Sequence, residues 1–215
     1  MSAVEDYLDA VDFYRGLESL DDQLGENPFI AAFAPVTLMA SGGFFAMTHF
    51  QTRKTTEDLD YILPEWAHDE EIKTPIRNAI GEVAEKHKYM ADWANDNMAL
   101  FVTRKAKKLL MENAIKQDIV LWSGENIRIL AAPVEWALET KLRRLHAKPR
   151  GRKAQSDMSD VLILLKSLGN EKGGKLDMEY YRTLNVNGFD IVPSVETMKR
   201  VAAVYKTQYN DDIFA

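Results

Sequence analysis

A short apolar run that ends in two glycines constrains the fold of this chain more than any other feature. The run Val36-Thr37-Leu38-Met39-Ala40 is followed directly by Ser41-Gly42-Gly43. Because it is short, apolar and bounded by a turn signal, it predicts a buried strand. A helix is expected over residues 44–51 and a second strand over residues 58–63. The chain therefore starts its sheet as a strand, a glycine turn, a helix and a further strand.

The remaining apolar patterns predict an α+β fold, in which a small mixed sheet is flanked by helices. Further strands are expected over residues 118–122 and 127–130, joined as a hairpin. The first helix is expected from Val4, where the apolar spacing starts, to about Gly25. Further helices are expected over residues 70–87, 95–113, 133–146, 157–168, 178–184 and 193–205. Since the pattern becomes helical at Pro133, the sequence predicts an α/β core with its N-terminal helix in residues 1–132 and a helical region in residues 133–215.

Composition excludes several classes of protein. Hydrophobic residues make up 46% of the chain, which is enough for a core, and 27 Lys and Arg against 33 Asp and Glu give a net charge of −6. The absence of cysteine excludes disulfides, thiol nucleophiles and Cys-ligated zinc. No apolar stretch is long enough to span a bilayer, and the acidic N-terminus has no secretory apolar segment, so a cytoplasmic protein without a membrane partner is expected.

Asp58 and Asp60 form the first candidate site. Residues two apart on a strand share a face, so these carboxylates are expected side by side, where their repulsion favours a divalent cation such as Mg²⁺. The backbone of Gly42 and Gly43 leaves room for a phosphate. Asp118 is either a third carboxylate on the same side or a solvated strand end.

Lys141 is a second, independent candidate. It shares a helical stripe with the apolar residues Val134, Leu138 and Leu145, so its ammonium either extends to solvent or meets a buried anion. Asp157 shares a stripe with apolar residues of the next helix, and its position near the helix start also suits an N-terminal cap.

Charge is distributed unevenly. Residues 1–26 hold eight acids and one base, whereas residues 141–156 hold seven bases and no acid. The basic segment 141–153 either binds phosphates or nucleic acid, or is a solvated helix end and loop.

Taken together, these residues resemble the nucleotidyltransferase superfamily, and most closely its AbiEii-type toxins of type IV toxin–antitoxin pairs and related nucleotidyltransferase-like proteins. The resemblance rests on residues 39–46, on the run Arg53-Lys54-Thr55-Thr56-Glu57-Asp58-Leu59-Asp60, on residues 131–142 with Lys141, and on the basic stretch that leads to Asp157-Met158-Ser159-Asp160. It covers residues 36–168.

The resemblance implies a nucleotidyltransferase fold and a set of site residues. These would be Ser41, Gly42, Gly43, Arg53 and Lys141 around the nucleotide, Asp58, Asp60 and Asp118 as ligands of Mg²⁺ or Mn²⁺, and Lys141 and Asp157 as further catalytic residues.

The expected function is transfer of a nucleoside monophosphate from a nucleoside triphosphate to an acceptor, which is RNA, a protein or a small molecule. Two alternatives stay open. One is a catalytically silent member of the fold that only binds, and the other is an RNA-binding module that uses segment 141–153.

Overall fold

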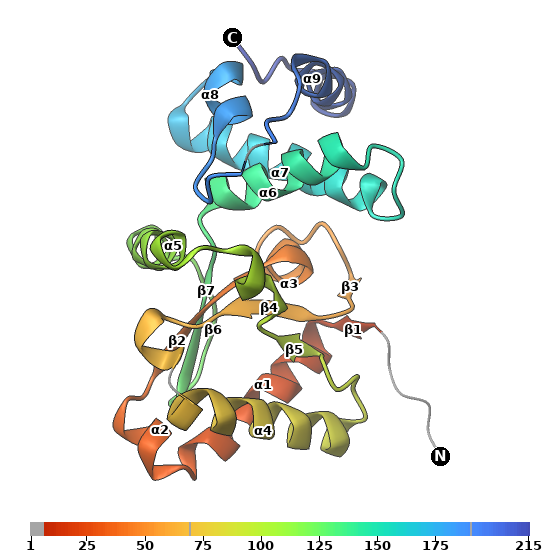
Figure 1. The fold of residues 1–215 in the computed structure, drawn as a ribbon. Coiled ribbons are helices and arrows are strands. Elements are labelled where there is room, and N and C mark those ends of the chain that lie inside the picture. The colour runs from red at the N-terminus through yellow and green to blue at the C-terminus, as the bar shows by residue number, and fades with distance from the viewer. Residues whose placement is uncertain (1–6, 69, 190) are drawn as a thin grey trace. The chain divides into compact units, whose positions relative to one another are not determined.

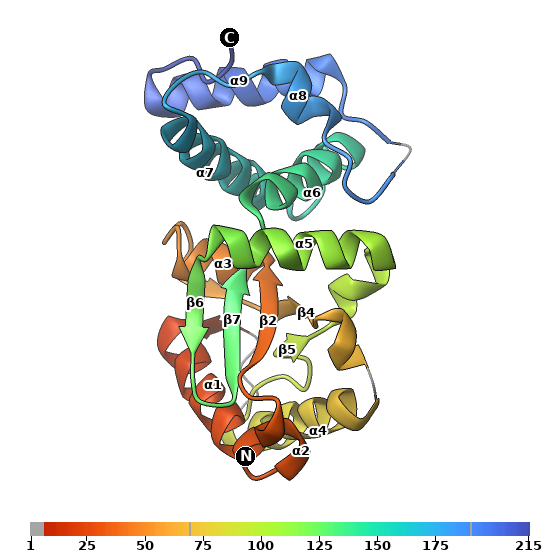
Figure 2. The same cartoon turned by 90° about the vertical axis from the view of Figure 1, so that its left-hand side faces the viewer.

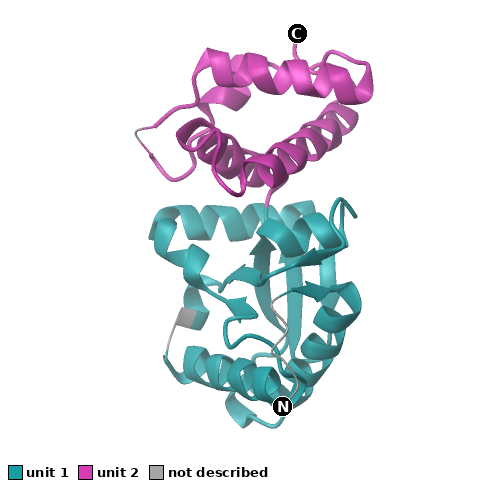
Figure 3. Cartoon of the chain, turned by 90° about the vertical axis from the view of Figure 1, so that its right-hand side faces the viewer, with its two compact units in different colours: residues 1–132 teal, residues 133–215 magenta. Residues whose placement is uncertain are grey.

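The computed structural model describes residues 7–68, 70–189 and 191–215, and the chain divides into two compact units, residues 1–132 and residues 133–215 (Figure 3). Val4, from which the first helix was expected, lies outside the described residues. Each unit is described by itself below.

Unit 1, residues 1–132, is built on a mixed five-stranded sheet in the order β5-β4-β2-β7-β6. The central strand β2 (Val36–Ser41) runs antiparallel to β4 (Leu59–Ile62) on one side and parallel to β7 (Ile127–Ala131) on the other. The outer strands are β5 (Ala94–Asn95) and β6 (Val120–Ser123), and a small separate sheet pairs β1 (Leu8–Asp9) with β3 (Thr55–Thr56) (Figure 1). The predicted small mixed sheet and the antiparallel hairpin of its last two strands are therefore confirmed.

The helices of unit 1 surround this sheet. They are α1 (Ala10–Gly25), α2 (Pro28–Ala32), α3 (Gly42–Thr48), η1 (Glu65–His68), α4 (Glu70–His87), η2 (Asn97–Phe101) and α5 (Arg104–Gln117). Figure 2 shows β6, β7 and β2 side by side, with α5 lying across the end at which β2 and β7 finish. That end of the sheet is also where α3 follows directly on β2.

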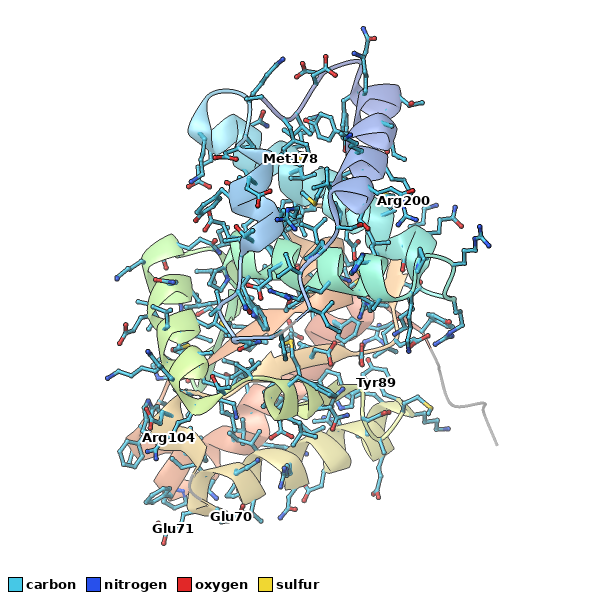
Figure 4. All side chains as sticks on the ribbon, turned by 45° about the horizontal axis from the view of Figure 1, so that its top comes forward. Glu70, Glu71, Tyr89, Arg104, Met178 and Arg200 are labelled. Carbon is cyan, nitrogen blue, oxygen red and sulfur yellow. The ribbon has the colours of Figure 1, made fainter. Side chains whose placement is uncertain are left out.

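The core of unit 1 joins α1 to α4 through aromatic side chains. Trp93 is fully buried and lies 6.1 Å from Phe13 between ring centroids, and its indole N–H donates to the Ile80 carbonyl. Tyr89, labelled in Figure 4, packs against Trp93 and donates its hydroxyl to the Asp12 carbonyl at 2.9 Å. The end of α4 and the segment after it are thereby fixed against α1.

Unit 2, residues 133–215, is helical. It comprises α6 (Val134–Ala147), α7 (Ala154–Lys172), α8 (Met178–Thr183) and α9 (Val195–Tyr209). The helices α6 and α7 pack together along buried leucines, among them Leu138, Leu142 and Leu165. Across the described residues of both units, no helix has the length and apolar character needed to cross a membrane.

The first expected helix is shorter than predicted. The carboxylate of Asp9 accepts hydrogen bonds from the backbone N–H groups of Val11 and Asp12, and so caps the helix. An N-cap residue is not itself helical, so Leu8 pairs with Thr56 in β1 instead of continuing the apolar stripe.

The single helix predicted over residues 95–113 is wrong. Asn95 belongs to β5, a turn of η2 follows, and α5 begins only after Thr103, whose hydroxyl accepts from the Ala106 N–H. The apolar spacing is continuous over residues 95–113, but polar residues break the helix. These are the run Asn95-Asp96-Asn97 and the helix cap Thr103.

Asp21 fixes the hairpin turn between β6 and β7. Its buried carboxylate accepts three backbone hydrogen bonds at 2.8–2.9 Å, from Glu125, Asn126 and Ile127. A Cβ on Gly124 would lie 2.4 Å from this carboxylate, so the turn needs glycine at the position that faces Asp21.

We expect Asp21→Ala to lower the free energy of unfolding by about 3 kcal/mol, because three backbone N–H groups lose a charged acceptor. Urea unfolding of the whole chain measures this change. The matched control is Asp22→Ala, which removes an exposed carboxylate from the same helix. Equal effects of the two substitutions would show that the hydrogen bonds of Asp21 do not stabilise the turn.

Candidate functional site

The glycine turn after β2 lies directly against the carboxylate of Asp60. Ser41, the last residue of β2, is the register partner of Asp60 on β4, and Gly42 follows with φ +71°, a conformation that favours glycine. A Cβ built on Gly42 would lie 3.1 Å from Asp60 Oδ2. Glycine at this position therefore lets the backbone pass beside the acid.

Gly43 has no space for a side chain. A Cβ on Gly43 would come within 1.9 Å of the Thr56 hydroxyl and 3.5 Å of a terminal guanidinium nitrogen of Arg53. Arg53 therefore places a positive charge beside the glycine turn.

Asp58 and Asp60 are both half-buried, whereas Leu59 and Tyr61 beside them are buried. Burial raises the pKa of Tyr61, so its hydroxyl stays neutral within the core. This alternation agrees with the predicted placement of the two carboxylates on one face and the apolar residues on the other.

Asn95 lies next to both carboxylates. On β5 it is the register partner of Asp60, and its side-chain amide donates to Asp58 Oδ2 at 3.4 Å. A row of polar residues, Ser41, Asp60 and Asn95, thus crosses three neighbouring strands of the sheet.

The carboxylates of Asp58 and Asp60 are the acidic groups beside the glycine turn that could bind Mg²⁺. Within the described residues there is no group of three acidic, histidine or cysteine side chains that could hold a metal. Mg²⁺ in proteins is usually bound by one or two carboxylates together with substrate phosphates and water, not by a complete protein cage. A magnesium ion at these two acids would therefore need a phosphate to complete its ligands.

Asp118 is not gathered with these two acids. The strand expected from residue 118 begins at Val120, and Asp118 instead ends α5 in a left-handed conformation with φ 51°. Its carboxylate accepts from Arg128 at 2.7 Å and its side chain is 67% exposed. Of the two alternatives for Asp118, the exposed position before a strand is the one observed.

Lys141 belongs to a buried ion cluster within unit 2. Its Nζ lies 2.7 Å from Asp160 Oδ2 and 3.2 Å from Asp157 Oδ1, and its side chain is only 9% exposed. Arg144 completes the cluster by donating through Nε to Asp157 Oδ2 at 2.6 Å and through a second nitrogen to Oδ1. The inward position of Lys141 is thus confirmed, and the anion that it meets here belongs to the protein itself.

Asp157 does not cap α7. This helix begins earlier than expected, at Ala154, and its N-cap residue Lys153 makes no side-chain cap hydrogen bond. Burial alone would raise the pKa of Asp157, but the hydrogen bonds and charges of Arg144 and Lys141 together lower it.

The lowered pKa of Asp157 predicts a contribution to stability that acid removes. Because the carboxylate is more acidic in the folded state, its contribution is complete above the unfolded pKa of about 3.9 and is lost as pH falls through the lower folded value. We expect the difference in free energy of unfolding between the protein and Asp157→Asn to shrink below about pH 4. Hydrogen exchange of residues 154–172 at several pH values measures it, and a pH-independent difference would contradict the assignment.

Only part of the basic segment 141–153 is exposed. Lys141 and Arg143 are buried, and Arg143 donates to Glu139 Oε1 at 3.2 Å and to the Leu184 carbonyl at 2.6 Å. The exposed bases of the loop between α6 and α7 are Lys148, Arg150, Arg152 and Lys153.

Sequence patterns do not predict the place of Asn95 or the partner of Arg144. Asn95 falls in the helix expected over residues 95–113, whereas Arg144 belongs to the basic segment but pairs with Asp157. Arg144 lies three residues after Lys141, and residues three apart on a helix are neighbours, so the spacing was a signal that both could meet one anion.

Comparison with known protein families gives one match. Residues 35–212 match a family model described as a domain of unknown function (DUF7582). No curated protein and no solved structure matches the chain.

Proposed function

The chain belongs to the DUF7582 family, matched over residues 35–212, and we propose that its unit 1 has a nucleotidyltransferase fold and acts as a Mg²⁺-dependent nucleotidyltransferase. One observation carries this proposal. Gly42 has a conformation that favours glycine, and a Cβ added to it would lie 3.1 Å from Asp60 Oδ2 at the end of the central strand. The glycine turn and a carboxylate that could bind a cation are therefore neighbours.

Each residue has a physical role in the proposed reaction. The backbone of the glycine turn at Gly42 and Gly43 would contact the triphosphate, and the Arg53 guanidinium beside Gly43 would offset its negative charge. Asp58 and Asp60 would hold Mg²⁺, which when bound supplies positive charge to the phosphate oxygens. The oxygen of an acceptor hydroxyl then forms a bond to the α-phosphorus while its proton passes to water, the bond between the α-phosphorus and the bridging oxygen breaks, and pyrophosphate leaves.

The proposal gives no chemical step to Lys141, Asp157 or Asp118. Lys141 and Asp157 are already paired with each other in unit 2, and Asp118 is paired with Arg128. The segments around Lys141 and Asp157 are part of the resemblance to AbiEii-type toxins. In this chain the two side chains form an ion pair that links α6 to α7.

Transfer of label from a nucleoside triphosphate tests the proposal. The full chain is incubated with each α-labelled triphosphate and Mg²⁺ or Mn²⁺, with and without cellular RNA, and the products are separated by size. Label that becomes attached to RNA, to protein or to a small molecule supports the proposal and names the acceptor class. Metal-dependent nucleotide binding without transfer in any mixture would favour the catalytically silent alternative.

A second candidate function is binding of a polyanion by unit 2. Residues 133–215 hold 14 Lys and Arg against 11 Asp and Glu, whereas residues 1–132 hold 13 against 22. Unit 2 is thus positive in a negative chain, and its loop of residues 148–153 exposes four bases. RNA retention that falls steeply with salt, without transferred label, would favour this candidate.

A further inference from the structure

Three aromatic side chains contact one another on the surface of unit 1. Phe29 lies in α2, Phe33 directly follows that helix, and Trp66 lies in η1. The ring centroids of Phe29 and Phe33 are 5.2 Å apart, and those of Phe33 and Trp66 are 5.7 Å apart. These residues are 39%, 50% and 49% exposed, in chain order. We call the three of them the aromatic patch.

The short helix α2 holds its two phenylalanines away from the core. The Asn27 side chain accepts the backbone N–H groups of Phe29 and Ile30 and so fixes the start of the helix. Ile30 is fully buried, whereas Phe29 and Phe33, four residues apart, share the other face. Aromatic rings that contact one another and stay exposed are typical of a surface that binds another protein.

The segments that carry the aromatic patch are acidic. Residues 18–35 hold four acids, residues 63–72 hold four more, and neither segment holds a Lys or Arg. The helix α4, which packs against both α2 and η1, begins with Glu70 and Glu71, which are exposed and labelled in Figure 4. Since charges across an interface are complementary, this surface favours a cationic partner.

Arginine is the base that suits both the rings and the acids. Its planar guanidinium stacks on an aromatic face and forms a forked pair with a carboxylate, whereas the ammonium of lysine has no plane to stack. The chain itself gives an example at this surface, where Arg104 donates to Glu65 at 2.5 Å while its side chain stays 86% exposed. Glu70, by contrast, accepts from the neutral hydroxyl of Thr74 at 3.0 Å, which brings no positive charge.

We propose that the aromatic patch binds an arginine-bearing segment of a partner protein, with a guanidinium over the faces of Phe33 and Trp66 and the surrounding acids as its counter-charges. This inference goes beyond the proposed function and does not depend on it. None of its residues belongs to the glycine turn or to the acids beside that turn.

Fluorescein-labelled hexa-arginine, added to the full chain, is the probe, and its anisotropy measures binding. The wild-type protein should bind it at least about threefold more tightly than hexa-lysine, because only the guanidinium stacks on the rings. Trp66→Leu keeps an apolar side chain but removes the ring face, so it should weaken hexa-arginine binding by about fivefold. Phe101→Leu is the matched control, which changes an aromatic residue that is 71% exposed outside the patch and should leave the affinity unchanged.

A second pair of variants tests the charge. Glu70→Gln should weaken the binding of both peptides by about twofold, which is typical of one exposed ion pair. Glu85→Gln, the matched control, removes an exposed acid near the other end of the same helix and should change neither affinity.

Two results overturn the inference. They are equal affinity of the wild-type protein for the two peptides, and unchanged hexa-arginine affinity in Trp66→Leu. Phe33→Leu, for which the same fivefold loss of about 1 kcal/mol is expected, decides if Trp66→Leu does not fold. Sedimentation tests a second copy of the chain as the occupant, and a dimer that Trp66→Leu dissociates would also overturn the inference.

Discussion

Replacing Lys141 with Met is expected to lower the free energy of unfolding of unit 2 by about 3–5 kcal/mol, the usual cost of removing one partner from a buried ion pair. The side chain of Met has a similar volume, so the change removes the charge and leaves the packing. Asp160, whose side chain is 3% exposed, then loses its nearest cation, and Asp157 keeps only Arg144. Urea unfolding followed by hydrogen exchange in α6 and α7 measures the loss.

Two further variants separate charge from packing. Lys148→Met removes an exposed charge just after the same helix and should change stability by less than about 0.5 kcal/mol. Asp160→Asn in the Lys141→Met background should restore much of the lost stability, because it removes the buried carboxylate that has lost its Lys141 partner. If the double substitution is no more stable than Lys141→Met alone, loss of the Lys141–Asp160 ion pair is not the cause.

Replacing both Asp58 and Asp60 with Asn is expected to abolish metal-dependent nucleotide binding and to reduce transfer by more than about 100-fold, since metal stabilisation of phosphate charge contributes several kcal/mol. The unliganded chain should still fold, because Asn has nearly the same shape as Asp and both positions are only half-buried. Calorimetry with Mg²⁺ and a non-hydrolysable triphosphate measures the binding.

Asp92→Asn is the matched control, because Asp92 is exposed and only its carbonyl contacts Asn95. It should leave nucleotide binding unchanged. Nucleotide affinity that survives in the double variant would refute the metal site. Loss of affinity in both proteins would point to general electrostatics instead.

The sequence predicts most of the framework of unit 1, because the decisive signals there are local. The apolar run before Ser41 forms β2, and the helix expected over residues 70–87 has those bounds in the structure. Asp60 lies opposite Ser41 because β2 and β4 are paired, and this pairing brings the acid of β4 to the end of β2.

The remaining features depend on contacts that no local pattern contains. The strand β5 has two residues, too few for a periodic signal, and only its pairing with β4 reveals Asn95. Helical spacing places Lys141 on the buried face, but spacing cannot tell whether a substrate or another helix supplies the anion. Asp118 shows how a boundary shifted by two residues moves a side chain from a strand to an exposed helix end.

The pairing of β2 with β7 has a consequence for the order in which the chain folds during synthesis. The middle of the sheet joins residues 36–40 to residues 127–131, and Asp21 binds the turn before β7 across 106 residues. Neither set of contacts can be complete before residues 125–131 have left the ribosome, so β2 stays without one neighbour while the rest of unit 1 is made. Such long-range closure gives unit 1 a high contact order, and it should fold more slowly than unit 2, whose main helix pair, α6 with α7, is consecutive in sequence.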